Sequence, residues 1–173
     1  MSTVLEGAGT TRSAERQANS LVRAWVGRAD AIESMLELNL AAADVVRGFE
    51  PNAVTDVTGF GLIGHTHELA SRSGVHAVLE AESLPALPGA LELAAGGIRT
   101  GGDRRNREFV GGNVDSSGDA AAEALAFDPQ TAGGLLVSVP VERAPVLEAT
   151  LRGAGIAGAR IGRIESGSGV TFG

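Results

Sequence analysis

The chain has 173 residues, 43% of them hydrophobic and 20% charged, which is typical of one globular domain with a sizeable core. Its formal net charge is −7 and it has no long basic run, which argues against a nucleic-acid-binding surface. It contains no Cys, Lys or Tyr, so thiol nucleophiles, disulfides, Cys-bound zinc, Schiff bases and the lysine of a P-loop are excluded.

The N-terminal segment over residues 1–13 is rich in Gly, Ser and Thr, and we expect it to be flexible. It has neither the basic start nor the apolar stretch of a secretory signal, and no apolar run reaches the ~20 residues of a membrane helix. The sequence therefore predicts a cytoplasmic protein without a membrane partner. We expect one domain over residues 14–165 and a fraying tail over residues 166–173.

Two helices are expected before the first strand. The first is short and amphipathic, with apolar residues at Leu21, Val22, Trp25 and Val26. Its Trp25 could lie in the core, or it could form a docking stripe for a partner chain or a missing domain. The second starts with a capping box at Asp30 and Glu33 and ends at Gly48. Its apolar stripe consists of Ile32, Met35, Leu36, Leu40, Ala43 and Val46.

A buried strand over Ala53–Val57 should lead through the TGFG loop into a helix that starts near Leu62 and ends at Gly74. Strands and helices then alternate, separated by irregular loops. The expected elements are a strand at Val75–Glu80, helices at Ala90–Ala95 and from an Asp119 cap through Ala126, a strand at Leu135–Val139, a helix at Val141–Gly153 and a final strand at Arg160–Ile164.

The motif DVTGFG places Asp56 at the end of a strand, before Thr58, Gly59 and Gly61. Such a turn into a helix would direct backbone N–H groups toward an anion, and Asp56 could hold Mg²⁺ bridging to phosphate. The alternative is that Asp56 caps the helix and the glycines only permit a tight turn.

The motif DPQTAGG follows about seventy residues later and offers a second site loop. Its candidate ligand-binding residues are Gln130, Thr131 and Gly133, although the motif could equally serve as a turn. The segment Thr100–Gly112, which includes Arg105 and Asn106, could form a mobile loop closing on an anion, or a solvated charged loop. His65 and His67 are two apart and cannot share a metal on a helix, so we expect a packed His65 and an exposed His67.

Four motifs taken together resemble the C-terminal half of selenophosphate synthetase (selenide, water dikinase), within the aminoimidazole ribonucleotide synthetase-like superfamily. They are MLELN from Met35, TDVTGFGLIGH from Thr55, GGDRRN from Gly101 and DPQTAGGLL from Asp128. The resemblance implies an α+β fold, an α/β sandwich with a mixed sheet covered by helices. It also implies an enzyme that forms selenophosphate, AMP and phosphate from ATP, selenide and water, with Asp56 contributing to a Mg²⁺ site.

That family carries its reactive Cys or selenocysteine, its essential Lys and most of its ATP ligands in an N-terminal domain. Because this chain has neither Cys nor Lys, we expect it to be inactive alone and to need that ATP-binding domain, or a separately encoded partner, for ATP and Mg²⁺ chemistry. The alternatives are a stand-alone anion-binding or regulatory module of the same fold, and a homodimer formed through an apolar patch.

Overall fold

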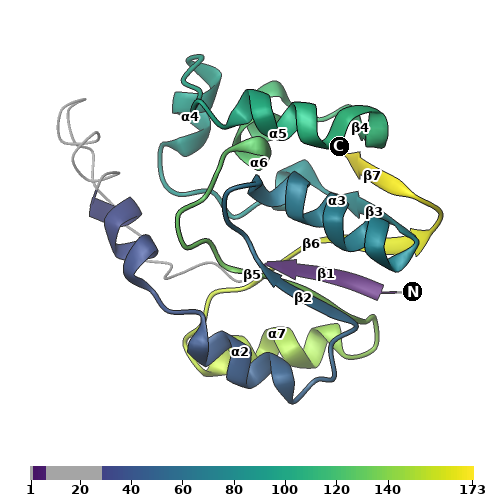
Figure 1. The fold of residues 1–173 in the computed structure, drawn as a ribbon. Coiled ribbons are helices and arrows are strands. Elements are labelled where there is room, and N and C mark those ends of the chain that lie inside the picture. The colour runs from purple at the N-terminus through teal and green to yellow at the C-terminus, as the bar shows by residue number, and fades with distance from the viewer. Residues whose placement is uncertain (1, 7–28) are drawn as a thin grey trace.

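A computed structural model of the chain describes residues 2–6 and 29–173. Its strands form one mixed sheet in the order β2-β5-β1-β6-β3-β7-β4 (Figure 1). The strands are β1 (Ser2–Glu6), β2 (Ala53–Asp56), β3 (Val75–Leu79), β4 (Val114–Ser116), β5 (Leu135–Pro140), β6 (Ala159–Ser166) and β7 (Gly169–Phe172). The first five strands in this order, β2, β5, β1, β6 and β3, pair antiparallel with their neighbours. Strand β7 pairs parallel with both β3 and β4.

Helices cover both faces of the sheet, with α2 and α7 on one side and α3, α5 and α6 on the other (Figure 1). The helices are α2 (Leu40–Arg47), α3 (Gly61–Ser73), α4 (Ala90–Ala95), α5 (Asp103–Val110), α6 (Ala120–Phe127) and α7 (Ala144–Gly153), with 3-10 turns at Ala81–Ser83 and Gly111–Asn113. The α/β sandwich with a mixed sheet covered by helices is therefore confirmed. Within the described part of the chain, no helix has the length and apolar character needed to cross a bilayer.

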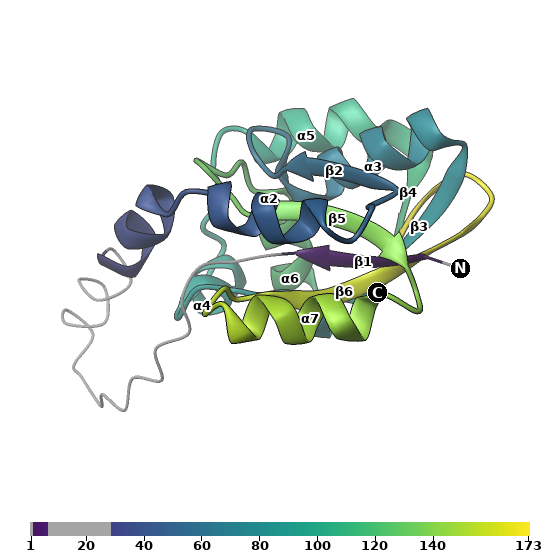
Figure 2. The same cartoon turned by 90° about the horizontal axis from the view of Figure 1, so that it is seen from below.

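Strand β5 shows how the sequence builds these two layers. Successive side chains of a strand point to opposite faces, so a strand that is covered on both sides is expected to be largely apolar, as β5 is apart from Ser138. Leu135 and Val137 pack with Leu147 of α7, whereas Leu136 packs with Ile63 of α3. Figure 2, seen from below, shows α2 and α7 beside β5 and β6.

Several local expectations are confirmed by cap geometry. Asp119 accepts hydrogen bonds from the amides of Ala121 and Ala122 at 2.9 and 3.2 Å and so starts α6. Gly74 ends α3 in the left-handed conformation, with φ of 64°. The helix Ala90–Ala95 has the bounds that the sequence predicts.

Other expectations are wrong. The single helix predicted from Asp30 to Gly48 is broken: residues 29–36 are helical, a non-helical turn follows, and α2 begins at Leu40. Most of its predicted apolar stripe is exposed, since only Val46 is buried. The segment predicted as a charged loop after Thr100 contains helix α5, stabilised by the ion pair of Asp103 with Arg107 one turn later.

Both ends of the chain also differ from expectation. Ser2–Glu6, predicted to be flexible, forms β1 between β5 and β6. Residues 169–172, predicted to be part of a tail, form β7, because Val170 and Phe172 are buried in the core around α3. The helix predicted around Trp25 lies outside the described residues.

Candidate functional site

Antiparallel pairing of β2 with β5 brings the two glycine motifs together. We name them the first glycine loop (Asp56–Gly61) and the second glycine loop (Asp128–Gly134). The amide of Val57 donates to the carbonyl of Gly134 at 2.9 Å, and the amide of Gly133 donates to the carbonyl of Val57 at 3.0 Å. The amide of Gln130 also donates to the carbonyl of Thr58 at 3.0 Å. Motifs about seventy residues apart therefore form one hydrogen-bonded unit.

Two of the glycines are required by this contact between loops. A Cβ on Gly133 would lie 2.3 Å from the carbonyl oxygen of Val57. Gly61 has φ of +68°, and its Cβ would lie 2.9 Å from the carbonyl oxygen of Asp128. Gly59 differs from both, because a Cβ there would meet nothing within 4 Å. Close backbone packing thus explains Gly61 and Gly133, while Gly59 borders open space.

Asp56 is exposed at the end of β2, at the start of the first glycine loop. No group of three or more His, Cys, Asp or Glu residues in the described part of the chain could hold a metal ion together. A carboxylate on an open surface still suits Mg²⁺, which often takes one or two carboxylates and completes its shell with water and phosphate oxygens. Asp56 could therefore be one ligand of a shared ion.

His65, buried on α3, contacts the first glycine loop through Thr58. It is 7% exposed on α3, and its Nε2 lies 3.1 Å from Oγ1 of Thr58. Burial lowers the pKa of His65 below the ordinary value, although Glu68 and Asp56 partly oppose this shift. The ring is therefore neutral near pH 7, and the expectation of a packed, hydrogen-bonded histidine is confirmed.

The polar residues of the second glycine loop are mostly bonded within the protein. The side-chain amide of Gln130 donates to the backbone carbonyl of Asp128 at 3.1 Å. The Asp128 carboxylate accepts a hydrogen bond from Thr100 Oγ1 at 2.7 Å. Thr131 is exposed. Of the residues predicted in this loop, Thr131 is thus the one that presents its side chain outward.

Helix α5 contributes Asn106 and Arg105 in different ways. Asn106 is 4% exposed, and its Nδ2 donates to the carbonyls of Gly59 at 3.0 Å and Phe127 at 2.9 Å. Arg105 is exposed, and its guanidinium forms no ion pair with the described residues. Arg107 pairs with Asp103 on the same helix and with Glu123 of α6, and so joins α5 to α6. Asn106 therefore holds the first glycine loop, and Arg105 is available to an external anion.

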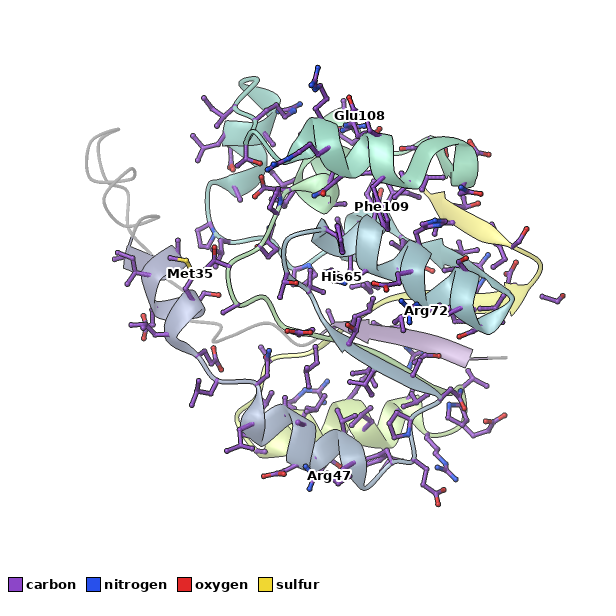
Figure 3. All side chains as sticks on the ribbon, in the orientation of Figure 1. Met35, Arg47, His65, Arg72, Glu108 and Phe109 are labelled. Atoms are coloured by element: carbon purple, nitrogen blue, oxygen red, sulfur yellow. The ribbon has the colours of Figure 1, made fainter. Side chains whose placement is uncertain are left out.

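An aromatic cluster that the sequence does not predict flanks the first glycine loop. Phe60 stacks on Phe109 of α5 with ring centroids 4.7 Å apart, although both side chains are more than 40% exposed. The rings of His67 and Phe109 meet edge to face with centroids 6.0 Å apart, and His67 is half-buried rather than exposed as predicted. In Figure 3, Phe109 lies where α5 meets α3, near His65.

Asn39 is a further residue whose role the sequence does not predict. It stands at the N-cap position of α2, yet its side chain makes no cap hydrogen bond. Its Nδ2 instead donates to the carbonyl of Gly133 at 2.9 Å. The only signal in the sequence is its place in the motif MLELN, because a contact across 94 positions has no local signature.

The chain matches a known protein family over nearly its whole length. The family described as AIR synthase related protein, C-terminal domain, matches residues 3–173. The chain belongs to this family. The match includes β1 and β7, in agreement with their places in the sheet.

Curated relatives of this AIR synthase related domain confirm the resemblance predicted from its motifs. Selenide, water dikinase 2 of Peptoclostridium acidaminophilum is 40% identical over 139 residues, which cover 79% of this chain and 40% of that protein. The selenide, water dikinase of Caldanaerobacter subterraneus subsp. tengcongensis is 44% identical over 119 residues, covering 68% of this chain and 34% of that protein. The chain therefore spans less than half the length of these relatives.

Solved structures agree on the fold. The hydrogenase maturation protein HypE of E. coli superposes with a TM-score of 0.57 at 18% identity, over 99% of this chain and 46% of that chain. PurL of T. maritima, complexed with AMPPCP, superposes with a TM-score of 0.52 at 10% identity, over 99% of this chain and 23% of that chain. At these identities the likeness concerns the fold alone.

Proposed function

We propose that this chain is the C-terminal domain of a selenophosphate synthetase, which forms selenophosphate, AMP and phosphate from ATP, selenide and water. The observation that carries the proposal is the exposed carboxylate of Asp56 at the junction of two bonded glycine loops. Sequence identity of about 40% to selenide, water dikinases supports the choice of reaction.

The residues facing outward have the chemistry that phosphate groups need. Asp56 would hold Mg²⁺, which when bound supplies charge neutralisation at phosphate oxygens. The guanidinium of Arg105 and the hydroxyls of Thr58 and Thr131 can donate hydrogen bonds to such oxygens. Gly61, Gly133, Gln130 and Asn106 would hold the two loops in shape. Gly59 would leave its backbone open to the ligand.

The proposal requires a partner. The chain has no Cys or Lys, so it cannot supply a thiol nucleophile or a lysine to the reaction. The partner would be an ATP-binding domain, in the same polypeptide or separately encoded, in the cytoplasm. The exposed apolar side chains of Met35, Leu36 and Leu38 offer this partner domain a contact surface. The alternative is that a second copy of the chain binds there.

The test compares the chain alone with a chimera in which it replaces the matched segment of the Caldanaerobacter relative. Both receive ATP, Mg²⁺ and selenide, and ³¹P NMR measures AMP and selenophosphate. We expect no turnover by the chain alone and both products from the chimera. AMP formation by the chain alone would refute the need for a partner. A folded but inactive chimera would favour the stand-alone binding module instead.

A further inference from the structure

The ring of His65 presents a hydrogen-bonding problem that the proposed function leaves open. Its Nε2 faces the hydroxyl of Thr58 at 3.1 Å, while its Nδ1 is buried and has no hydrogen-bond partner among the residues that the structure describes. The neighbouring ring is that of Phe60, with centroids 5.5 Å apart and ring planes tilted by 59°, and it carries no oxygen or nitrogen that could accept a hydrogen bond from Nδ1.

A neutral imidazole carries one N–H, and the two tautomers have different consequences here. With the proton on Nδ1, a buried N–H would lack any acceptor, and orphaned buried N–H groups are rarer than under-satisfied acceptors. With the proton on Nε2, that N–H donates to Oγ1 of Thr58 and only a lone pair is left unpaired. The second tautomer is therefore the one that this burial favours.

The direction of the Thr58 hydroxyl follows from this choice. A hydroxyl has one hydrogen to donate and two lone pairs that accept. If Nε2–H occupies a lone pair of Oγ1, the hydroxyl hydrogen cannot point at His65 and is free to point elsewhere. We propose that His65 is held as the Nε2–H tautomer by Thr58, and thereby turns the Thr58 hydroxyl into an outward hydrogen-bond donor for a phosphate-type oxyanion.

The surroundings of Thr58 suit such a ligand. Gly59 follows it, and a Cβ at Gly59 would meet none of the described atoms within 4 Å, so the backbone next to Thr58 borders open space. The exposed Asp56 lies two residues before, where a cation could neutralise part of the ligand charge. A hydroxyl that accepts one hydrogen bond also donates more strongly, because linked hydrogen bonds polarise one another. The choice of oxyanion rests on the proposed function, and His65 acts as a positioning residue.

The tautomer can be measured directly on the whole chain. Long-range ¹H–¹⁵N NMR spectra distinguish protonated from unprotonated ring nitrogens, and His65→Gln assigns the His65 signals among the three histidines. We expect Nε2 to be protonated and Nδ1 to be unprotonated at pH 7.5. Protonation mainly at Nδ1 would overturn the inference.

Matched variants at Thr58 test the link between the two residues. In Thr58→Val the acceptor of Nε2–H is lost, so the tautomers should mix, whereas Thr58→Ser keeps the hydroxyl and should retain the wild-type pattern. Unchanged ring signals in Thr58→Val would show that Thr58 does not set the tautomer.

Titration with inorganic phosphate in the presence of Mg²⁺ tests the outward donor. We expect Thr58→Val to weaken phosphate binding about tenfold, because the hydroxyl donor is lost. Thr58→Ser keeps that hydroxyl and should bind phosphate like wild type. Equal responses of wild type and Thr58→Val would remove the outward donor. These results do not depend on turnover: an inactive chimera together with an Nε2–H tautomer would refute the reaction and leave the His65 assignment standing.

Discussion

The two glycine loops have similar sequences but occupy different positions in the structure. Each combines a carboxylate, a hydroxyl residue and a pair of glycines, and from the sequence both qualify as anion-binding loops. In the structure the second glycine loop lies against the first, and its Gly133 and Gln130 amides donate to carbonyls of the first loop. The first glycine loop keeps Asp56 and Gly59 on the open side.

The difference shows that a glycine-rich motif can be required for contact between two backbones as well as for contact with a ligand. Gly133 and Gly61 have their close neighbours inside the protein, whereas Gly59 has none. Which glycine is structural depends on the register of β2 with β5, and this register is not written in either motif. Variants at the two loops should therefore differ in what they damage.

The largest effect on stability is expected at the contact between the loops. Gly133→Ala would place its Cβ 2.3 Å from the Val57 carbonyl oxygen and should lower the free energy of unfolding by about 2–4 kcal/mol. Gly59→Ala, with open space at the same atom, should change it by less than about 0.5 kcal/mol. Urea denaturation measures both. Equal losses would mean that the two glycines play the same role.

The two asparagines that support the loops should rank next. Asn106→Ala leaves two carbonyls, those of Gly59 and Phe127, without a donor, and should cost about 2–3 kcal/mol. Asn39→Ala removes one half-buried hydrogen bond to Gly133 and should cost about 1 kcal/mol. The same denaturation series compares them, and a larger loss for Asn39 would contradict the assignment of Asn106 as the main support.

Variants of the neighbouring arginines Arg104 and Arg105 on α5 separate residues that bind the ligand from residues that support the fold. In the chimera, Arg105→Ala should raise the KM for ATP about five- to tenfold, because it removes an exposed cation next to Asn106 that forms no ion pair with the described residues. Arg104 is paired with Glu108 and exposed, so Arg104→Ala should leave KM unchanged. Initial rates at varied ATP concentrations give the KM of each variant. Equal KM values for the two variants would show that Arg105 does not belong to the ATP site.

The smallest effect is a pH dependence of stability. Because burial lowers the pKa of His65 in the folded state, the unfolded chain binds more protons below its own pKa of about 6.5. Stability should therefore fall as pH drops from about 7 toward the folded-state pKa. His65→Gln removes this contribution, while His67 and His76 remain in both proteins. The difference in urea midpoint between pH 7.5 and 5.5 should thus be smaller in the variant, and an identical difference would exclude His65.

Local signals predicted much of this fold. The capping residue Asp119, the terminating Gly74 and the apolar run of β5 act within one turn or one strand, so the elements they define were correctly predicted. Helix α5 was predicted as a loop because its flanking glycines and arginines suggest mobility, whereas its stability comes partly from Glu123 on another helix.

Long-range pairing explains the remaining errors. Strand β7 is short and follows a bend at Gly167 and Ser168, and its strand character depends on pairing with β3 and β4. Asp56 and Thr58 were predicted as site residues from their motif. The contacts of Asn39 with Gly133 and of Asn106 with Gly59 could not be predicted, because they join residues that are distant in the sequence.

Under the proposed function the Asp56 carboxylate serves the reaction rather than the fold, and paired variants of the chimera test this role most directly. Asp56 ends β2 at one edge of the sheet, and Asp115, also exposed, lies on β4 at the opposite edge. Asp56→Asn should lower kcat/KM about 10²-fold or more, because a ligand for the phosphate-bound cation is lost, without a change in the urea midpoint. Asp115→Asn should leave both unchanged. An Asp56→Asn chimera as active as its Asp115→Asn counterpart would contradict the account.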